Sequence, residues 1–411
     1  MNNLNTKYDF VTEYDVVVAG GGLAGVAAAL AAARCGQKCC LIEKTIFTGG
    51  LATIGCVLFY LPLSDARGQQ IIFGISEELL KASIQYGPGS IPDWRHNEKL
   101  RYECRFNPAS FILSLDELLA ADEVDLWYDT LLCATEVTNG KITGAVVENK
   151  SGRGLIRGKN FVDATGDADL AFRARAKCTT QQNFLSVWGM GYSYEVAKYA
   201  VEQKDGSHLA QLIAYGASNA GVGQPENQRT LSGVIGRDVS EFVIKSRKLV
   251  LDAFKEMQQK IGSNGRNEVF PAMLPAMCNF RTTRHIDGIY TLQTGDEFKH
   301  FPDCVGAAAD WRGGQDIWEL PYRAMISPDV KGLLAAGRCL ASAGESWEVW
   351  RVIQAAAMSG EVAGLASAMA AERGISSDEL PVGDLQTELR KRNFLLDIRE
   401  LSKLPRTVVE A

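Results

Sequence analysis

A glycine-rich turn between an apolar strand and an alanine-rich helix constrains the fold of this chain most. Residues 14–19, YDVVVA, are apolar and β-branched, as in a strand of a parallel sheet that is covered on both faces. Gly20–Gly25 follow, and the alanine-rich residues 26–34 favour a helix that stops at Gly36. Residues 38–43, KCCLIE, then predict a second short strand. The chain therefore opens with a β-turn-α-β unit.

Three glycines in this turn have the spacing GxGxxG. Gly20 permits the tight turn, Gly22 lets the main chain approach a pyrophosphate, and Gly25 lets the helix pack closely on the strand. The helix N-terminus then faces the phosphates. Glu43 follows Gly20 by 23 residues, where a carboxylate accepts hydrogen bonds from an adenosine ribose and disfavours an additional phosphate. We therefore predict a dinucleotide site.

Two later segments favour FAD over NAD as this dinucleotide. Residues 48–53, TGGLAT, follow the second strand and suit a loop against a second phosphate or the flavin. Residues 162–167, VDATGD, end a later strand that would return to the same crevice. Residues 233–236, GVIG, lack the spacing of a second dinucleotide turn, and the sequence contains no CxxC pair. These two observations disfavour the pyridine-nucleotide disulfide reductases.

The middle of the chain predicts a meander and an inserted domain. Strands over 124–128, 131–137 and 142–148 alternate with turn residues as an antiparallel meander would, and a further strand covers 161–164. Residues 183–325 have no comparable βαβ signal, so we interpret them as a substrate-facing domain inserted in the first.

The last part of the chain predicts a return to the first domain. A strand is expected over 331–336, a turn at Gly337, a long helix over 350–371 and a peripheral charged helix around 385–401. The predicted fold class is α/β: a Rossmann-type FAD-binding domain with a parallel sheet and β-meander, an inserted α+β substrate domain and a C-terminal helical tail. The domain boundaries follow: 1–182 with 326–372 for FAD, 183–325 for substrate and 373–411 for the tail.

A set of motifs spread over most of the chain resembles the FAD-dependent oxidoreductase family of the glutathione reductase type 2 superfamily, which has fumarate-reductase-like and thiazole-synthase-like relatives. The matching residues are Gly20–Gly25 with Ala29, Glu43–Lys44, Gly49–Thr53, Asp163–Asp169 and Gly332–Arg338. The resemblance implies non-covalent FAD, with residues 336–338 near the isoalloxazine ring. It also places Arg351, Val352 and Ile353 at the start of the last long helix, whose positive end would face the flavin pyrimidine.

The expected cofactor residues come from all of these segments. They are Gly20, Gly22, Leu23, Ala24, Gly25, Glu43, Lys44, Gly49, Gly50, Leu51, Ala52, Thr53, Ala164, Thr165, Gly166, Asp167, Gly337, Arg338, Val352 and Ile353.

Arginines are the candidates for contact with the substrate. Arg281 and Arg284 lie three residues apart, and guanidinium groups fork onto carboxylates, so both could hold an acidic substrate; an intramolecular salt bridge is the alternative. Arg105 is a further candidate for anion contact. His285 could donate or accept a proton, although a lone histidine is more often structural. The predicted catalytic residues are Arg284, His285 and Arg351.

Composition limits the classes of partner. The chain has 411 residues, 46% of them hydrophobic, and a net charge of −6, which favours a globular protein with a small-molecule substrate and disfavours nucleic acid. Ten cysteines without metal-like spacing predict reduced thiols, a cytoplasmic location and no metal. Glycines interrupt the apolar run over 16–33, so we expect no membrane span. The oligomeric state is left open.

The predicted function is hydride transfer between a small organic substrate and flavin N5. An alcohol, an amine and an activated C=C all fit, and NAD(P)H or another electron carrier is a further candidate partner. A flavin-dependent monooxygenase is the closest alternative, and it needs space for oxygen beside the flavin. A flavin-binding module of a larger complex, without catalysis of its own, is an alternative from a different class.

Overall fold

The computed structural model describes residues 8–65, 67–91, 93, 104–209, 211–312, 316–404 and 406–411. Its centre is a seven-stranded sheet. The predicted β-turn-α-β unit is confirmed as β1 (Phe10–Ala19), α1 (Leu23–Arg34) and β2 (Cys39–Ile42), with β1 and β2 parallel. The unit occupies the middle of the sheet, because β1 also pairs in parallel with β8 (Gly152–Asp163).

The parallel part of the sheet differs from the prediction at one strand. β5 (Asp125–Trp127) pairs in parallel with β2 and is not part of the meander. The reason is that α3 (Pro108–Ala121) precedes it, and a crossover through a helix returns the chain in the parallel direction. β19 (Leu333–Ala335) completes this part of the sheet beside the carboxyl-terminal half of β8.

The antiparallel part consists of β6 (Leu131–Thr138), β7 (Lys141–Asn149) and the first half of β8. β8 is twelve residues long and serves both parts of the sheet: residues 152–157 pair with β7, and residues 161–163 pair with β19. The meander prediction is therefore confirmed for β6 and β7, with β8 as its third strand.

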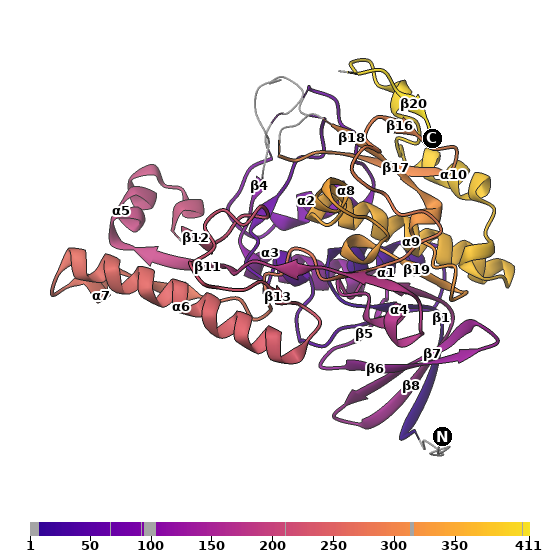
Figure 1. Ribbon diagram of the computed structural model, residues 1–411, viewed down its shortest axis with the longest axis horizontal. Helices are drawn as coiled ribbons and strands as arrows, with labels where there is room; N and C mark the ends of the chain where they lie inside the picture. Colours follow the sequence, from indigo (N-terminus) through magenta and orange to yellow (C-terminus); the bar gives the residue numbers. More distant parts are fainter. Residues whose placement is uncertain are drawn as a thin grey trace.

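Alternate side chains of β1 enter two different cores. Val16 and Val18 pack with α1 and α9 (Ile353–Arg373), whereas Val17 and Ala19 pack with side chains of β7, β8 and β19. This alternation is what a strand covered on both faces requires. Figure 1 shows α1 and α9 beside each other over the sheet, with the β6–β8 hairpins extending below them.

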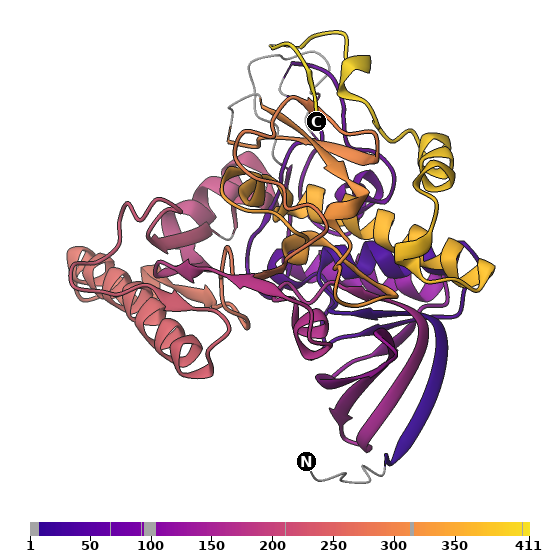
Figure 2. The ribbon, with the colours of Figure 1, turned by 45° about the vertical axis from the view of Figure 1, so that its right-hand side comes forward.

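A second lobe projects from the first domain, on the left in Figure 1 and again in Figure 2. Its three-stranded sheet has the order β12-β11-β14, namely Gln211–Gly216, Ser186–Ser193 and Val269–Met273. The helices of the lobe are α5 (Tyr194–Gln203), α6 (Gly236–Ile261) and α7 (Gly265–Glu268). From Arg284 onwards the chain lies against the first domain, because β15 (Arg284–Ile286) pairs with β9 (Cys178–Thr180).

The C-terminal part contains two differences from the prediction. The single helix expected over 350–371 is divided into α8 (Glu345–Trp350) and α9, with Arg351 and Val352 between them. The predicted tail helix is α10 (Val382–Lys391), and it is not peripheral, because Leu385 and Leu389 are fully buried in the core that contains α1 and α9.

Short elements complete the structure. The strands are β3 (Phe59–Tyr60), β4 (Cys104–Arg105), β10 (Gln182–Asn183), β13 (Leu231–Ser232), β16 (Lys299–His300), β17 (Cys304–Ala309), β18 (Ile317–Pro321) and β20 (Val409–Glu410). The helices are α2 (Ile75–Ser83), α4 (Asp169–Arg173) and six single turns, Gly50–Ala52, Gly206–His208, Tyr322–Ala324, Gly337–Cys339, Ser377–Glu379 and Ile398–Glu400. Within the described residues, no helix has both the length and the apolar character needed to cross a membrane.

Candidate functional site

The carboxyl ends of β1, β2, β8 and β19 meet at one edge of the sheet, and a cavity of about 630 Å³ opens there. This is the place where open α/β sheets bind their ligands. Of the expected cofactor residues, those that line the cavity are Gly20, Gly22, Leu23, Ala24, Glu43, Lys44, Gly49, Gly50, Leu51, Ala52, Ala164, Thr165, Gly166, Gly337, Arg338, Val352 and Ile353. Gly25, Thr53 and Asp167 are not among the residues that line it.

Two glycines of the first turn are required by packing. Gly20 has φ +98°, and a Cβ atom on it would lie 2.5 Å from the carbonyl oxygen of Ala164. A Cβ atom on Gly25 would lie 1.8 Å from the carbonyl oxygen of Gly20. Any side chain at these positions would push α1 away from β1 and β8. The two glycines therefore bring the helix N-terminus close to the sheet edge.

Gly22 differs, because a Cβ atom on it would meet nothing within 4 Å. It is the N-cap residue of α1, and no side chain caps this helix end. The N–H groups of the first helical turn lack intrahelical acceptors, and Leu23 and Ala24 of that turn line the cavity. Uncapped donors at the positive end of a buried helix form an anion site, so this turn fits the pyrophosphate of a dinucleotide.

Glu43 follows β2 at the same edge and is 8% exposed. Its Oε2 atom accepts a hydrogen bond from the N–H of Gly21 at 2.7 Å. Its Oε1 atom accepts from the N–H and the hydroxyl of Thr45, each at 2.8 Å. The carboxylate is thereby held in one orientation at the wall of the cavity, where it fits the ribose role expected of it.

The loop at Gly49 and Gly50 is joined to the first turn by its backbone. The N–H of Gly49 donates to the carbonyl of Gly21 at 2.8 Å, and both loop glycines have positive φ, +93° and +56°. Thr53 is fully buried, and its hydroxyl donates to the carbonyl of Thr48 at 2.6 Å. Thr53 therefore holds the loop in place, while Gly49 and Gly50 form part of the cavity wall.

Arg338 connects three segments at the edge of the cavity. Its Nε donates to the carbonyl of Gly166 at 2.5 Å, its Nη1 donates to the carbonyl of Phe280, and its Nη2 pairs with Asp167 at 3.0 Å. Asp163, fully buried at the end of β8, accepts from the backbone and the hydroxyl of Thr165, and burial raises the pKa of its carboxyl group. These contacts fix the turn after β8 against the turn after β19.

Beyond the expected cofactor residues, the cavity continues into a second part that we call the chamber. It is lined by Phe59, Trp188, Asn219, Arg281, Trp311, Arg312 and Arg351. The rings of Phe59 and Trp188 meet edge to face with centroids 6.2 Å apart. Apart from the arginines at 281 and 351, these residues carry no local motif. They come from distant segments, so only the fold brings them together.

Glu348 of α8 organises one side of the chamber. It accepts hydrogen bonds from Arg351 and from the side-chain amide of Asn219, and its backbone carbonyl accepts from the indole of Trp311 at 3.0 Å. Arg351, a predicted catalytic residue, therefore lines the cavity with its charge balanced by a carboxylate.

Two of the three substrate candidates of the sequence, Arg281 and Arg284, lie in the segment 281–285, and their surroundings differ. Arg281 lines the chamber, and its Nη1 donates to the carbonyl of Ala217 at 2.9 Å. Arg284 does not line it: this residue is 5% exposed, pairs with Asp169 at 2.6 Å and donates to the carbonyl of Asp167 at 2.8 Å. The salt-bridge alternative therefore describes Arg284, and its substrate and catalytic assignments are corrected.

His285 is also removed from the cavity. It is 2% exposed, its Nδ1 atom lies 2.7 Å from the carbonyl oxygen of Ile286, and its ring contacts Trp347 edge to face. Burial lowers its pKa, which favours the neutral imidazole. The predicted acid/base role of His285 is corrected for the same reason as that of Arg284: β15 lies against β9, and its side chains are buried behind the cavity wall. Arg105 is exposed and stacks over the ring of Phe59 at 5.0 Å, outside the cavity lining.

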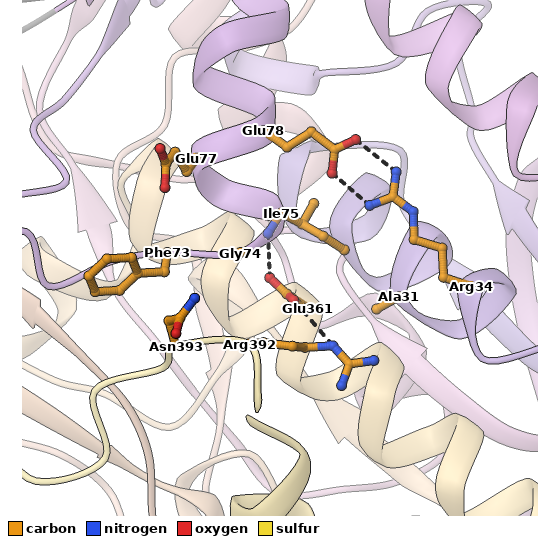
Figure 3. A pocket seen from close by; sticks show the side chains of 10 residues that line it. All are labelled: Ala31, Arg34, Phe73, Gly74, Ile75, Glu77, Glu78, Glu361, Arg392 and Asn393. Atoms are coloured by element: carbon orange, nitrogen blue, oxygen red, sulfur yellow. Dashed lines mark hydrogen bonds and ion pairs between the residues drawn. The ribbon is translucent and has the colours of Figure 1, made fainter. Parts of the chain in front are cut away.

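A smaller cavity of about 330 Å³ lies between α1, α2, α9 and the segment after α10 (Figure 3). Glu361 of α9 is buried at its base and accepts a hydrogen bond from the N–H of Ile75 at 2.6 Å. Burial raises the pKa of Glu361 to about 7. Arg34 and Glu78 on its wall form a two-pronged ion pair, and most of the residues that line this cavity are polar or charged (Figure 3).

One group of described side chains has ligand atoms close enough together for a metal ion: His300, Glu319 and Asp397. The carboxylate of Glu319 already accepts hydrogen bonds from the N–H groups of Phe301 at 2.7 Å and Ile398 at 2.9 Å. Asp397 pairs with Arg399 at 2.7 Å. These contacts join the C-terminal segment to β16 and β18.

Comparison with known proteins places the chain in a family. A geranylgeranyl bacteriochlorophyll reductase-like protein from Thermoplasma acidophilum is similar at 15% identity and a TM-score of 0.45, over 93% of this chain and 83% of that one. The myxobacterial chondrochloren halogenase is similar at 12% identity and a TM-score of 0.46, over 93% of this chain and 79% of that one. The 3-ketosteroid-delta4-(5alpha)-dehydrogenase from Rhodococcus jostii RHA1 is similar at 14% identity and a TM-score of 0.41, over 89% of this chain and 98% of that one. The family model described as FAD dependent oxidoreductase matches residues 15–186 and 193–389. Since this match covers most of the sequence, the chain belongs to the FAD dependent oxidoreductase family, and its cofactor is FAD.

Proposed function

We propose that this enzyme transfers a hydride between a small organic substrate, bound in the chamber, and FAD. The observation that carries the proposal is that one cavity includes both the residues expected to hold FAD and the chamber of aromatic and cationic side chains. A substrate in the chamber would therefore share an enclosed space with the cofactor, as hydride transfer between them requires.

The first part of the cavity supplies binding and orientation. The N–H groups at Leu23 and Ala24 would hold the pyrophosphate, and Glu43 would hold the ribose. The N-terminus of α9, at Val352 and Ile353, has no side-chain cap and lines the cavity, so its positive end would favour negative charge on the cofactor. FAD, when bound, supplies the two-electron chemistry.

The chamber would position the substrate and keep water out. Phe59, Trp188 and Trp311 offer apolar surface, while Asn219 and Arg351 are held by Glu348 and offer fixed polar groups. We assign Arg351 to positioning, since its charge is balanced within the protein. Arg284 and His285 have no part in the proposed reaction.

Anaerobic reduction of the bound flavin tests this function. The purified FAD-loaded enzyme is mixed with alcohols, amines, 2-hydroxy acids, sugars and NAD(P)H, and the flavin absorbance is followed. We expect one organic class to bleach the flavin, or an activated alkene to reoxidise the chemically reduced enzyme. Trp188→Ala should slow that reaction, whereas Tyr194→Ala, at an exposed position of α5, should not.

Two results would contradict hydride transfer to a substrate. One is that no donor bleaches the flavin and no alkene reoxidises it, which favours the binding-module alternative. The other is that the turnover product carries label from labelled dioxygen, which identifies a monooxygenase.

A further inference from the structure

Four arginines line the cavity, and three of them have carboxylate partners. Arg338 pairs with Asp167 at 3.0 Å, Arg351 pairs with Glu348, and Arg312 pairs with Asp310 at 2.8 Å and with Glu345 at 2.5 Å. For Arg281 the described part of the chain provides no ion pair. Arg281 is thus the one arginine of the cavity without a carboxylate partner among the described residues; the other cation of the lining, Lys44, is exposed to solvent.

Arg281 is nevertheless held firmly in place. Its backbone N–H donates to the side-chain oxygen of Asn183 at 3.1 Å, and its Nη1 donates to the carbonyl of Ala217 at 2.9 Å. The other N–H groups of the guanidinium have no acceptor among the described residues, and Arg281 lines the cavity. Burial and the nearby charge of Arg351 lower the pKa of Arg281, against the opposing effect of the Glu348 carboxylate, which is itself paired with Arg351.

A half-buried cation without a counter-charge costs free energy unless a ligand supplies the anion. The guanidinium presents parallel donors that match the two oxygens of a carboxylate. The nearby walls of the chamber are aromatic, at Phe59, Trp188 and Trp311. A ligand that satisfies both features has an apolar or aromatic body and one carboxylate.

We infer that Arg281 binds the carboxylate of the substrate, and that the substrate is an organic acid whose apolar part lies against the aromatic walls of the chamber. That the bound acid is the substrate rests on the proposed function. The binding itself is independent of turnover. Arg281 is then the residue that selects acids over neutral molecules of the same shape.

Binding of benzoate to the FAD-loaded protein tests the inference, with benzamide as the neutral probe of similar shape. The flavin absorbance spectrum reports both ligands in titrations without turnover. We expect benzoate to bind more tightly than benzamide. Arg281→Gln should weaken benzoate at least tenfold and change benzamide less than twofold, and Arg281→Lys should have an intermediate effect because it retains the charge without the planar fork.

Arg237→Gln is the matched control, because it removes the same charge at an exposed position of α6. It should leave both affinities unchanged. FAD content and melting temperature show that each variant is folded, and Arg281→Lys keeps the test available if the glutamine variant is unstable.

Three outcomes would overturn the inference. The first is that benzoate and hexanoate both fail to bind the wild-type protein saturably. The second is that Arg281→Gln weakens benzoate and benzamide equally. The third is that Arg281→Gln reduces FAD affinity while benzoate affinity stays the same, which assigns Arg281 to the cofactor. If benzoate behaves as expected but no donor reduces the flavin, only the proposed reaction fails.

Discussion

Gly22 and Gly25 lie three residues apart in the turn after β1, yet a side chain would meet different surroundings at each. At Gly22 a methyl group would enter the open cavity, whereas at Gly25 it would overlap the carbonyl oxygen of Gly20. Gly22→Ala should therefore leave the stability of the FAD-free protein nearly unchanged and weaken FAD at least tenfold, which is about 1.4 kcal/mol. Gly25→Ala should destabilise the FAD-free protein itself, by about 3 kcal/mol.

Thermal unfolding of the FAD-free proteins and FAD titration followed by flavin fluorescence measure these two effects separately. Each variant is the control for the other, because both replace a glycine of the same GxGxxG motif with alanine. Equal loss of FAD-free stability in both variants would contradict the different roles that we assign to the two glycines.

At the scale of single residues, the sequence predicts the cavity lining better at the glycine turns than in the segment 281–285. The glycines and Glu43 have a spacing that the dinucleotide turn itself requires, so most of them line the cavity. Arg281, Arg284 and His285 are close in sequence, but no local rule states which side chain faces a ligand. β15 pairs with β9 and buries Arg284 and His285, and only Arg281 reaches the chamber.

At the scale of elements, α1 and α9 approach each other closely along one seam. A Cβ atom on Gly360 would lie 2.0 Å from the carbonyl oxygen of Ala24, and one on Gly364 would lie 2.0 Å from that of Ala28. Gly364→Ala should push the helices apart and lower the free energy of unfolding by about 1–3 kcal/mol. FAD affinity should fall as well, because the N-terminal ends of both helices line the cavity.

Urea unfolding of the FAD-free protein measures this change. Gly383→Ala in α10 is the control: a Cβ atom there meets nothing within 4 Å, so the variant should be as stable as the wild type or more stable by about 0.5–1 kcal/mol. If Gly364→Ala were equally well tolerated, the close helix contact would not be a requirement of the fold.

Glu361 links α9 to the first residue of α2, and its titration should make stability depend on pH (Figure 3). Burial raises its pKa to about 7, with Glu78 also raising it and Arg392 and Arg34 opposing. Between about pH 4.5 and 7 the folded protein keeps this proton while the unfolded chain has lost it. The contribution of Glu361 to stability therefore falls as pH rises through this range, by up to about 3 kcal/mol.

The variant Glu361→Gln should lack this fall in stability with rising pH. Its free energy of unfolding, relative to that of the wild type, should therefore increase from pH 5 to pH 8. Unfolding free energies measured at several pH values test this. Glu372→Gln, exposed near the end of the same helix, should follow the wild-type profile. Parallel profiles for Glu361→Gln and the wild type would show that Glu361 does not retain its proton in the folded state.

The elements that the sequence mispredicts are those whose direction or end depends on distant contacts. Periodicity indicates a strand near Asp125–Trp127 but not its partner, and the partner is the parallel β2 rather than a meander strand. The apolar run after Trp350 resembles one helix, yet it is interrupted at Arg351 and Val352, where the cavity begins. Helix propensity alone contains no signal for that interruption.

At the scale of the whole molecule, the C-terminal segment closes the core beside the central sheet. Residues far apart in sequence meet there: Leu385 and Leu389 of α10 are buried with α1 and α9, and β20 pairs with β16. The isolated sequence of α10 is charged enough to suggest a peripheral helix. Its two buried leucines, four residues apart on one face, are the signal that it packs against the core.

Leu389→Ala tests whether this segment and the FAD-binding domain unfold together. The leucine is fully buried, so its truncation should cost about 2–5 kcal/mol. If the molecule is one cooperative unit, the loss appears in the same transition that releases FAD, and circular dichroism and flavin fluorescence give the same midpoint. Thr387→Ala, exposed on the same helix, should change the midpoint little. An early transition of Leu389→Ala that retains FAD would show instead that the C-terminal segment unfolds on its own.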